Sequence, residues 1–339
     1  MTQPMSRPTR VGGWCPGAAG LLAALATMAV VVGAAAQPTP KPHRVGWLSP
    51  AGAAMGAPNL DALRQGLRDQ GYQEGRDYVI EARWADGASE RLPDLARELV
   101  ALRVDVICTA GTQASRAARD ATTTIPVVFA NVAFPVQQEL VASYAHPGGN
   151  VTGVAFIGPE YGKRLELLKE AVPRLARVAI IYNPENAGGV LAVEETKRWA
   201  QLLRVTLHPQ PFRGPQDMDQ AFETIARRRP EALMTTADPL IASYRTRIVA
   251  FANKHRLVSM FPGREYVDAG GLMFYGGSIP EMYRRAAVYV DRIRKGAKPS
   301  ELPVEQPVKF DMIINLKTAR ALGVTIPPSL LARADKVIE

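Results

Sequence analysis

Short apolar runs alternate with segments of helical period along most of the chain, beginning at residue 44. The apolar runs are rich in β-branched and aromatic residues, which favour strands. The segments between them repeat apolar residues every three or four positions; in residues 91–103, for example, four leucines fall on one helical face. This alternation is typical of a parallel sheet whose strands are joined by crossover helices.

The pattern gives a list of expected elements. In the first half, strands are expected at 44–49, 77–85, 104–110, 125–131 and 150–157, with helices at 59–72, 91–103 and 113–123. In the second half, strands are expected at 177–183, 205–212, 231–238, 257–263 and 270–276. Helices alternate with them at 162–173, 189–204, 217–229, 240–256 and 280–299, and the tail at 309–334 is not assigned to elements.

The pattern restarts after the turn at 146–150, which is the best candidate for a first crossing between two halves. A Pro-rich segment at 298–307 is a candidate for a later crossing. We therefore expect an α/β protein of two doubly wound, Rossmann-like lobes, each with about four parallel strands and with a ligand cleft between them. A barrel of eight β/α units is the alternative that fits the strand count, and a single large sheet is a weaker one.

The first 36 residues differ from the rest of the chain. Arg7 and Arg10 precede an almost wholly small or apolar stretch at 17–36, which ends in Ala34 and Ala36 at the spacing that signal peptidase requires. We expect residues 1–36 to be a secretory signal peptide that is removed after export to the periplasm. An uncleaved anchor is the alternative, although few of the side chains are large enough for a stable membrane span.

Charge and cysteine content exclude some classes of protein. The net charge is +9, and the basic residues are scattered, with no run longer than the three arginines at 227–229. Nucleic acid is therefore not expected as a partner. Removal of the signal peptide would leave Cys108 as the only cysteine, so no internal disulfide is expected.

Polar and small residues follow several of the expected strands, and open parallel sheets bind ligands beyond these carboxyl ends. After the strand at 104–110, Thr112 is expected to cap a helix that begins near Gln113. Free backbone amides at such a helix start favour a carboxylate, and Gly111 lets a ligand approach the backbone. An ordinary strand-to-helix turn is the alternative.

The second half has matching loops at 182–186 and 235–239. Asp238 follows an apolar strand, where its carboxylate needs a partner: a ligand ammonium or hydroxyl, or the helix start that Pro239 predicts. Asn131 and Asn183 are amides at strand ends that can donate and accept, and both are also common turn residues. Aromatic residues near these ends either form the core or line an apolar ligand; they are Trp47, Phe134, Phe156, Tyr182, Phe261 and Tyr275.

Motifs of catalysis and metal binding are missing from the sequence. There is no nucleotide-binding glycine loop, no nucleophile elbow and no metalloprotease motif, and the four histidines are scattered. No cofactor and no metal are expected. Cys108 is expected to be a buried strand residue rather than a nucleophile. Glu265 and Asp268 form either an acid/base pair or part of a polar loop.

Several segments together resemble one family across residues 44–339. They include "RVGWLSP" (44–50), "PGGNVTG" (147–153), "IIYNPEN" (180–186), "TTADP" (235–239) and "INLKTARALGVTIP" (314–327). The chain resembles the ABC-transporter substrate-binding proteins of the tryptophan and tyrosine type. The resemblance implies a periplasmic-binding-protein fold of type I, with three crossings between the lobes. It implies lobes formed by 44–151 with about 272–300, and by 152–271 with about 303–339.

The resemblance also implies roles for particular residues. Thr112 matches a threonine that meets a ligand carboxylate, Asn183 lies in the family's Tyr-Asn loop, and Asp238 matches an aspartate that pairs with a ligand amino group. Where family members often have Thr-Asp-Pro, this chain has Ala-Phe-Pro at 133–135, so a carboxylate-bearing compound without an amino group is equally compatible. The expected ligand-binding residues are Ser49, Gly111, Thr112, Gln113, Asn131, Phe134, Tyr182, Asn183, Asp238 and Tyr275.

The leading hypothesis is a monomeric periplasmic protein that binds a small carboxylate-bearing solute, such as an amino acid or aromatic acid, by closure of its lobes. The resemblance implies permease subunits in the inner membrane as partners. Two alternatives stay open: an enzyme of two Rossmann-like lobes, such as a glycosyltransferase or racemase, and a ligand-sensing lobe of a membrane receptor.

Overall fold

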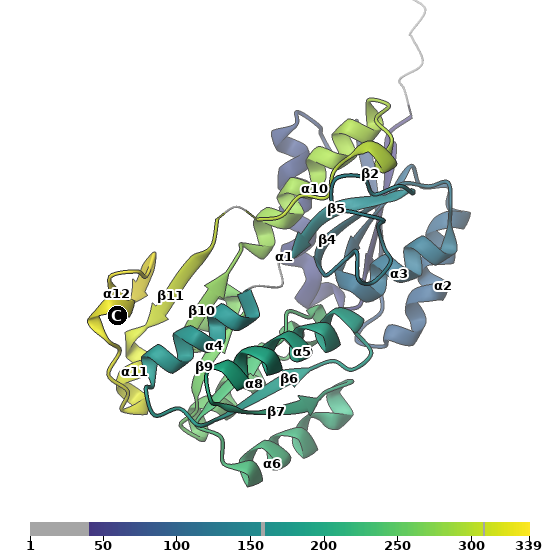
Figure 1. The fold of residues 1–339 in the computed structure, drawn as a ribbon. Coiled ribbons are helices and arrows are strands. Elements are labelled where there is room, and N and C mark those ends of the chain that lie inside the picture. Colours follow the sequence, from purple (N-terminus) through teal and green to yellow (C-terminus); the bar gives the residue numbers. More distant parts are fainter. Residues whose placement is uncertain (1–40, 157–159, 308) are drawn as a thin grey trace, which may run out of the picture. The chain divides into compact units, whose positions relative to one another are not determined.

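A computed structural model describes residues 41–156, 160–307 and 309–339 of the 339-residue chain (Figure 1). The signal peptide expected at 1–36 lies outside these residues. Within the described ranges, none of the helices combines the length and the apolar character that a membrane crossing requires.

The first sheet has five parallel strands in the order β2-β1-β3-β4-β5. Its strands are β1 (His43–Ser49), β2 (Tyr78–Trp84), β3 (Val106–Ala110), β4 (Val127–Ala133) and β5 (Val151–Phe156). Its helices are α1 (Ala53–Asp69), α2 (Leu92–Ala101), α3 (Gly111–Ala121) and α10 (Ile279–Arg294), with the short 3-10 helices η1 (Ser89–Arg91) and η3 (Pro299–Glu301).

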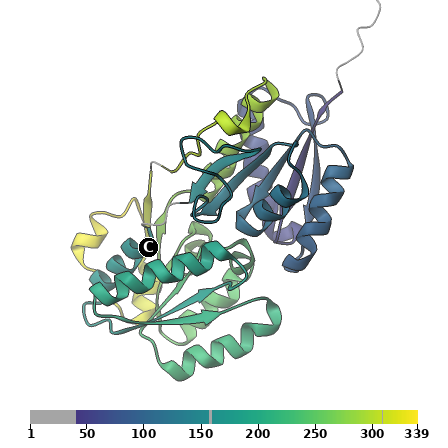
Figure 2. The same cartoon turned by 45° about the vertical axis from the view of Figure 1, so that its right-hand side comes forward.

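Both faces of this sheet are covered by helices. The leucines of α1 and the apolar residues of α10 pack on one face with Trp47 and Cys108. The leucines of α2 and the alanines of α3 pack on the other face with Ile107 and Phe129. Helices α1 and α10 lie side by side in both views, although more than 200 residues separate them (Figure 1, Figure 2). The lobe is therefore doubly wound, as the sequence predicted.

The second sheet has seven strands in the order β12-β11-β10-β9-β8-β6-β7. They are β6 (Arg177–Tyr182), β7 (Thr206–Pro211), β8 (Ala232–Thr235), β9 (Val258–Phe261), β10 (Met273–Gly276), β11 (Asp311–Asn315) and β12 (Lys336–Ile338). Helices α4 (Glu160–Ala171), α5 (Ala187–Leu202), α11 (Leu316–Leu322) and α12 (Pro328–Leu331) contribute to one apolar core. A second apolar core contains the helices α6 (Met218–Arg228), α7 (Pro239–Ser243), α8 (Arg245–Lys254) and α9 (Arg264–Asp268). The 3-10 helix η2 (Pro215–Asp217) precedes α6.

The chain passes between the two sheets three times. Strand β5 belongs to the first sheet, whereas α4 packs on β9 and β10 of the second. Strand β10 belongs to the second sheet, whereas α10 packs on α1, β4 and β5. The segment after η3 then runs beside β5, where the Glu305 N–H donates to the Gly153 carbonyl at 3.1 Å, before it enters the second sheet as β11.

The observed sheets settle the choice of architecture. Two separate open sheets exclude the β/α barrel. The expectation of about four parallel strands in each half was wrong, because the sheets have five and seven strands and β11 is antiparallel to β10. Strand β11 has this direction because β10 leaves the second sheet toward α10 and the chain returns from the same side, without a crossover helix of its own.

Other differences from the expected elements are local. The helix expected at 240–256 is broken at Tyr244, where φ is −104° and ψ is 12°. In the tail of the chain, α11 ends at Gly323, whose φ of +71° is left-handed, and two prolines follow at 327–328. Strand pairing also crosses the expected lobe boundaries, since residues 152–156 pair with β4 and residues 273–276 pair with β9 and β11.

Candidate functional site

The expected ligand-binding residues lie mainly at the carboxyl ends of strands in both sheets. Ser49 ends β1, and Asn131 and Phe134 lie at the end of β4. Tyr182 ends β6, and Asn183 follows it. Gly111, Thr112 and Gln113 begin α3 after β3; Asp238 follows β8, and Tyr275 lies in β10. The two sheets therefore present these residues from the edge where open α/β sheets bind ligands.

Asp238 has internal partners for both of its carboxylate oxygens. Its Oδ1 accepts a hydrogen bond from the Ile241 N–H at 3.0 Å and so caps α7. Its Oδ2 accepts from the Asn186 Nδ2 at 2.7 Å. Burial raises the pKa of Asp238, and these hydrogen bonds oppose the increase. The predicted capping role is confirmed.

Asn186 joins this loop to the start of α5. Its Oδ1 accepts from the Gly188 N–H at 3.0 Å and from the Gly189 N–H at 3.4 Å, as an N-cap. Asn183 orders the same loop, because its Oδ1 accepts from the Glu185 N–H at 3.0 Å. Sequence reasoning missed Asn186, although an asparagine two residues before a Gly-Gly pair is a recognisable cap signal.

Thr112 does not cap α3 as expected. The helix begins two residues earlier than expected, at Gly111, with Ala110 at the N-cap position and no side-chain capping hydrogen bond. The chain turns into the helix at Gly111, where φ is +77°. The Thr112 hydroxyl instead lies inside the first turn and accepts a long hydrogen bond from the Gln138 Nε2 at 3.5 Å.

Thr112 and Gln138 lie next to α5, a helix that packs on the second sheet. A Cβ built on Gly188 of α5 would lie 3.0 Å from both the Thr112 Oγ1 and the Gln138 Nε2. A Cβ on Gly111 would lie 3.0 Å from the Pro239 Cγ, next to Asp238. The starts of α3, α5 and α7 therefore meet here. Gln138 had no periodic or motif signal in the sequence.

Several buried polar atoms near the strand ends lack a hydrogen-bond partner among the described residues. They are Asn131 Oδ1, Gln138 Oε1, Asn183 Nδ2, Thr235 Oγ1, Thr236 Oγ1 and the Tyr283 hydroxyl. A buried polar group without a partner costs about 1–3 kcal/mol, so native proteins seldom retain a group of them. Asn131 also has a left-handed φ of 58°, at a register shift in β4. A left-handed residue and unpaired polar atoms therefore occur together at these strand ends.

The aromatic residues divide into two groups. Trp47, Phe156 and Phe261 are fully buried in the apolar cores, which is the packing alternative. The other three, Phe134, Tyr182 and Tyr275, are partly exposed. The Ser49 hydroxyl is buried and accepts from the Ala51 N–H at 3.2 Å.

A buried ion pair, which sequence reasoning missed, lies at the crossings between the sheets. The Arg164 Nη2 lies 2.5 Å from the Glu160 Oε2, and both side chains are at most 2% exposed. The Arg164 Nε also donates to the Tyr275 carbonyl at 2.6 Å. Burial raises the pKa of Glu160 to about 7, and the nearby guanidinium opposes the increase. The pair ties the start of α4 to β10, next to the second crossing.

Neither metal ligands nor a nucleophile are evident in the described part of the chain. No group of three or more His, Cys, Asp or Glu side chains there is arranged to hold an ion. Burial raises the pKa of the Cys108 thiol to about 12, so it is not an activated nucleophile. Asp268 lies 3.3 Å from Arg264 in a partly exposed ion pair, and burial raises the pKa of Glu265.

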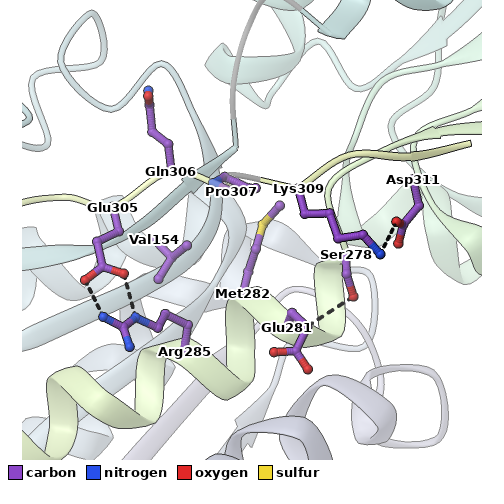
Figure 3. A pocket seen from close by; sticks show the side chains of 10 residues that line it. All are labelled: Val154, Ser278, Glu281, Met282, Arg285, Glu305, Gln306, Pro307, Lys309 and Asp311. Atoms are coloured by element: carbon purple, nitrogen blue, oxygen red, sulfur yellow. Dashed lines mark hydrogen bonds and ion pairs between the residues drawn. The ribbon is translucent and has the colours of Figure 1, made fainter.

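A pocket of about 570 Å³ lies along the crossing segments (Figure 3). Val154, Met282 and Pro307 are apolar residues of its lining. Two ion pairs, Arg285–Glu305 at 2.6 Å and Lys309–Asp311 at 2.9 Å, flank it (Figure 3). None of the expected ligand-binding residues lines this pocket.

Two open α/β sheets joined by three crossings, with polar groups at facing strand ends, define the type I periplasmic binding proteins, a class of two-lobed solute-binding proteins. The family described as "ABC transporter substrate binding protein" matches residues 55–338. The chain belongs to this family. It is therefore a substrate-binding protein and not an enzyme, and the enzyme alternative is set aside.

Known relatives agree with this assignment. A tyrosine-binding protein of Clostridioides difficile is 25% identical over 272 residues, which are 79% of this chain and 78% of the relative. A conserved domain protein of Vibrio cholerae is 29% identical, with a TM-score of 0.83 over 88% of this chain and 100% of that one. The structure of an ABC domain from Streptococcus pneumoniae in complex with L-Trp is 25% identical, with a TM-score of 0.81 over the same shares.

Proposed function

We propose that this protein is the solute-binding component of an ABC importer and captures a small carboxylate-bearing solute, an amino acid or an aromatic acid, by closure of two lobes. The lobes are built on the five-stranded and the seven-stranded sheet. In this proposal the expected signal peptide directs the chain to the periplasm, where it acts as a monomer and delivers its solute to permease subunits in the inner membrane.

The set of buried polar atoms without partners is the observation that carries the proposal. The atoms come from strand ends of both sheets and the loops after them: Asn131 and Gln138 in the first, and Asn183, Thr235 and Thr236 in the second. All are neutral groups that can orient a polar ligand without a catalytic role. The L-Trp complex and the tyrosine-binding relative favour an aromatic amino acid as the ligand.

The start of α3 is the proposed carboxylate site. The helix has 11 residues, and its first backbone N–H groups carry partial positive charge. The buried Thr112 hydroxyl lies beside them and can donate to a ligand carboxylate while it accepts from Gln138. A ligand at this place would contact groups from both sheets and so stabilise a closed arrangement of the lobes.

A thermal-shift screen of the purified protein against amino acids, aromatic acids and uncharged sugars tests the proposal. A ligand at 100 times its dissociation constant stabilises the folded protein by about 2.7 kcal/mol. Thr112→Val keeps the side-chain shape and removes the hydroxyl, so it should weaken binding of the best ligand by about three- to tenfold. If no carboxylate-bearing compound raises the melting temperature, the proposed solute class is wrong.

A further inference from the structure

The pocket of about 570 Å³ is bounded by segments that lead into both sheets (Figure 3). One side is the start of α10, which follows the second crossing, and the other is the third crossing, at 305–307 and 309–311. The two crossings touch, because a Cβ built on Gly277 would lie 2.9 Å from the Pro307 side chain and 3.1 Å from the Met282 Cε. The volume of the pocket is in the range of small-molecule sites.

The apolar part of the lining is held in place by backbone hydrogen bonds. Val154 and Met282 are 3% and 2% exposed. The third crossing is fixed to β5 on both sides of Val154: the Glu305 N–H donates to the Gly153 carbonyl at 3.1 Å, and the Glu305 carbonyl accepts from the Ala155 N–H at 2.8 Å. The pocket therefore offers a preformed apolar surface to the body of a ligand.

Five charged side chains line the pocket, and four of them form two ion pairs. Arg285 donates to both oxygens of Glu305, at 2.6 Å and 2.8 Å. Lys309 lies 2.9 Å from Asp311 (Figure 3). Each pair contains one cation and one carboxylate, so the net charge of the lining is set by the fifth side chain, Glu281.

Glu281 is the lining carboxylate whose partner lies outside the lining. Its Oε1 accepts from the Arg284 Nη1 at 3.1 Å, but the Arg284 Nε also donates to Asp69 at 2.5 Å. One guanidinium is therefore shared by two carboxylates. The Glu281 side chain is 63% exposed and lies beside Ser278 at the edge of the pocket, where a ligand can reach it (Figure 3). A positively charged group complements this lining.

We propose that this pocket is a second ligand site, which binds a small organic cation with its apolar body against Val154 and Met282 and its charge beside Glu281. The site is separate from the solute site of the proposed function, since none of the expected ligand-binding residues lines it. A ligand here contacts both α10 and the third crossing. It therefore stabilises the arrangement of the crossings in which the pocket is formed.

An NMR titration with three probes that share one body tests the charge of the ligand. The probes are hexylamine, 1-hexanol and hexanoate. The signal is the methyl resonance of Met282 in protein labelled at its methionine methyl groups, assigned by its loss in Met282→Leu. Hexylamine should shift this resonance in a saturable way. Hexanol should bind about threefold more weakly and hexanoate about tenfold more weakly, because an exposed ion pair contributes little more than this.

Glu281→Lys reverses the charge at the edge of the pocket. The variant should bind hexylamine about tenfold more weakly than the unmodified protein and should prefer hexanoate to hexylamine. Its melting temperature should change little, because the side chain is exposed. Glu301→Lys makes the same change at a carboxylate that is 70% exposed and lies outside the lining, so this matched control should keep the preference for hexylamine.

The outcomes separate this inference from the proposed function. If hexylamine leaves the Met282 resonance unchanged, or if hexanol or hexanoate binds as tightly, the inference is overturned and the proposed function stands. If Thr112→Val weakens the binding of hexylamine, the amine occupies the solute site and the inference is again overturned. The proposed function fails separately if no carboxylate-bearing compound raises the melting temperature while hexylamine still shifts the Met282 resonance.

Discussion

Arg164→Met removes the positive charge of a fully buried ion pair and keeps much of the apolar side chain. In the protein, the guanidinium donates to Glu160 at 2.5 Å and to the Tyr275 carbonyl at 2.6 Å. It also lies 5.3 Å from the centre of the Phe156 ring and 5.1 Å from that of Tyr161. The substitution leaves Glu160 buried without its counter-charge.

The expected loss of stability depends on pH. Loss of one partner from a buried pair costs about 3–5 kcal/mol when the remaining group stays charged. Burial already raises the pKa of Glu160 from 4.5 to about 7 with Arg164 present, and removal of the guanidinium raises it further. Between pH 4.5 and this raised pKa, the folded variant holds a proton that the unfolded chain releases. The free energy of unfolding of the variant therefore falls as the pH rises, and its deficit against the unmodified protein grows from pH 7 to pH 9.

Urea unfolding followed by circular dichroism at pH 5.5, 7 and 9 measures this difference. Lys163→Met is the matched control, because Lys163 is the neighbouring residue and its pair with Glu166, at 2.9 Å, is exposed. The control should lose less than about 1 kcal/mol at every pH. An Arg164→Met loss that is equally large at all three pH values would show that lost packing, and not the uncompensated charge, explains the effect.

Two further predictions concern close packing and burial. Gly188→Ala should weaken ligand binding about tenfold, because the new Cβ would crowd Thr112 and Gln138 at 3.0 Å. The melting temperature of the ligand-free protein should change little. Calorimetry and thermal unfolding measure the two effects, and an unchanged affinity would contradict the prediction. Burial raises the pKa of the Cys108 thiol to about 12, so Cys108 should resist iodoacetamide at pH 8 until urea unfolds the protein. Peptide mass spectrometry detects the label. Rapid labelling of the folded protein would refute the burial argument.

The local sequence was sufficient to predict most elements. The apolar run at 104–110 and the leucine pattern at 91–103 predicted β3 and α2, and the strand at 177–183 predicted β6 within one residue of its end. Asp238 followed by proline predicted the start of α7, since a cap depends only on neighbouring residues. Such features depend on interactions along a few residues, and their signal is therefore contained in short segments.

The candidate site was predicted less completely, because its main contacts join distant residues. The Asn186–Asp238 hydrogen bond spans 52 positions, and the approach of Gly188 to Gln138 spans the two sheets. Glu265 was recognised in the sequence only as part of a polar loop or an acid/base pair. Its place depends on the packing of α9 on β9 and β10, which no local pattern specifies.

Periodicity and motifs are properties of short segments, and they were enough to predict the alternation of strands and helices, the division into two α/β halves and the family resemblance. The antiparallel direction of β11 relative to β10 and the burial of the Glu160–Arg164 pair are visible only in the folded chain. An i, i+4 pair of opposite charges reads in sequence as an ordinary surface pair. Its burial, and so its energetic weight, depends on residues from β5 and β10 that pack over it, and long-range packing leaves no spacing signal in the chain.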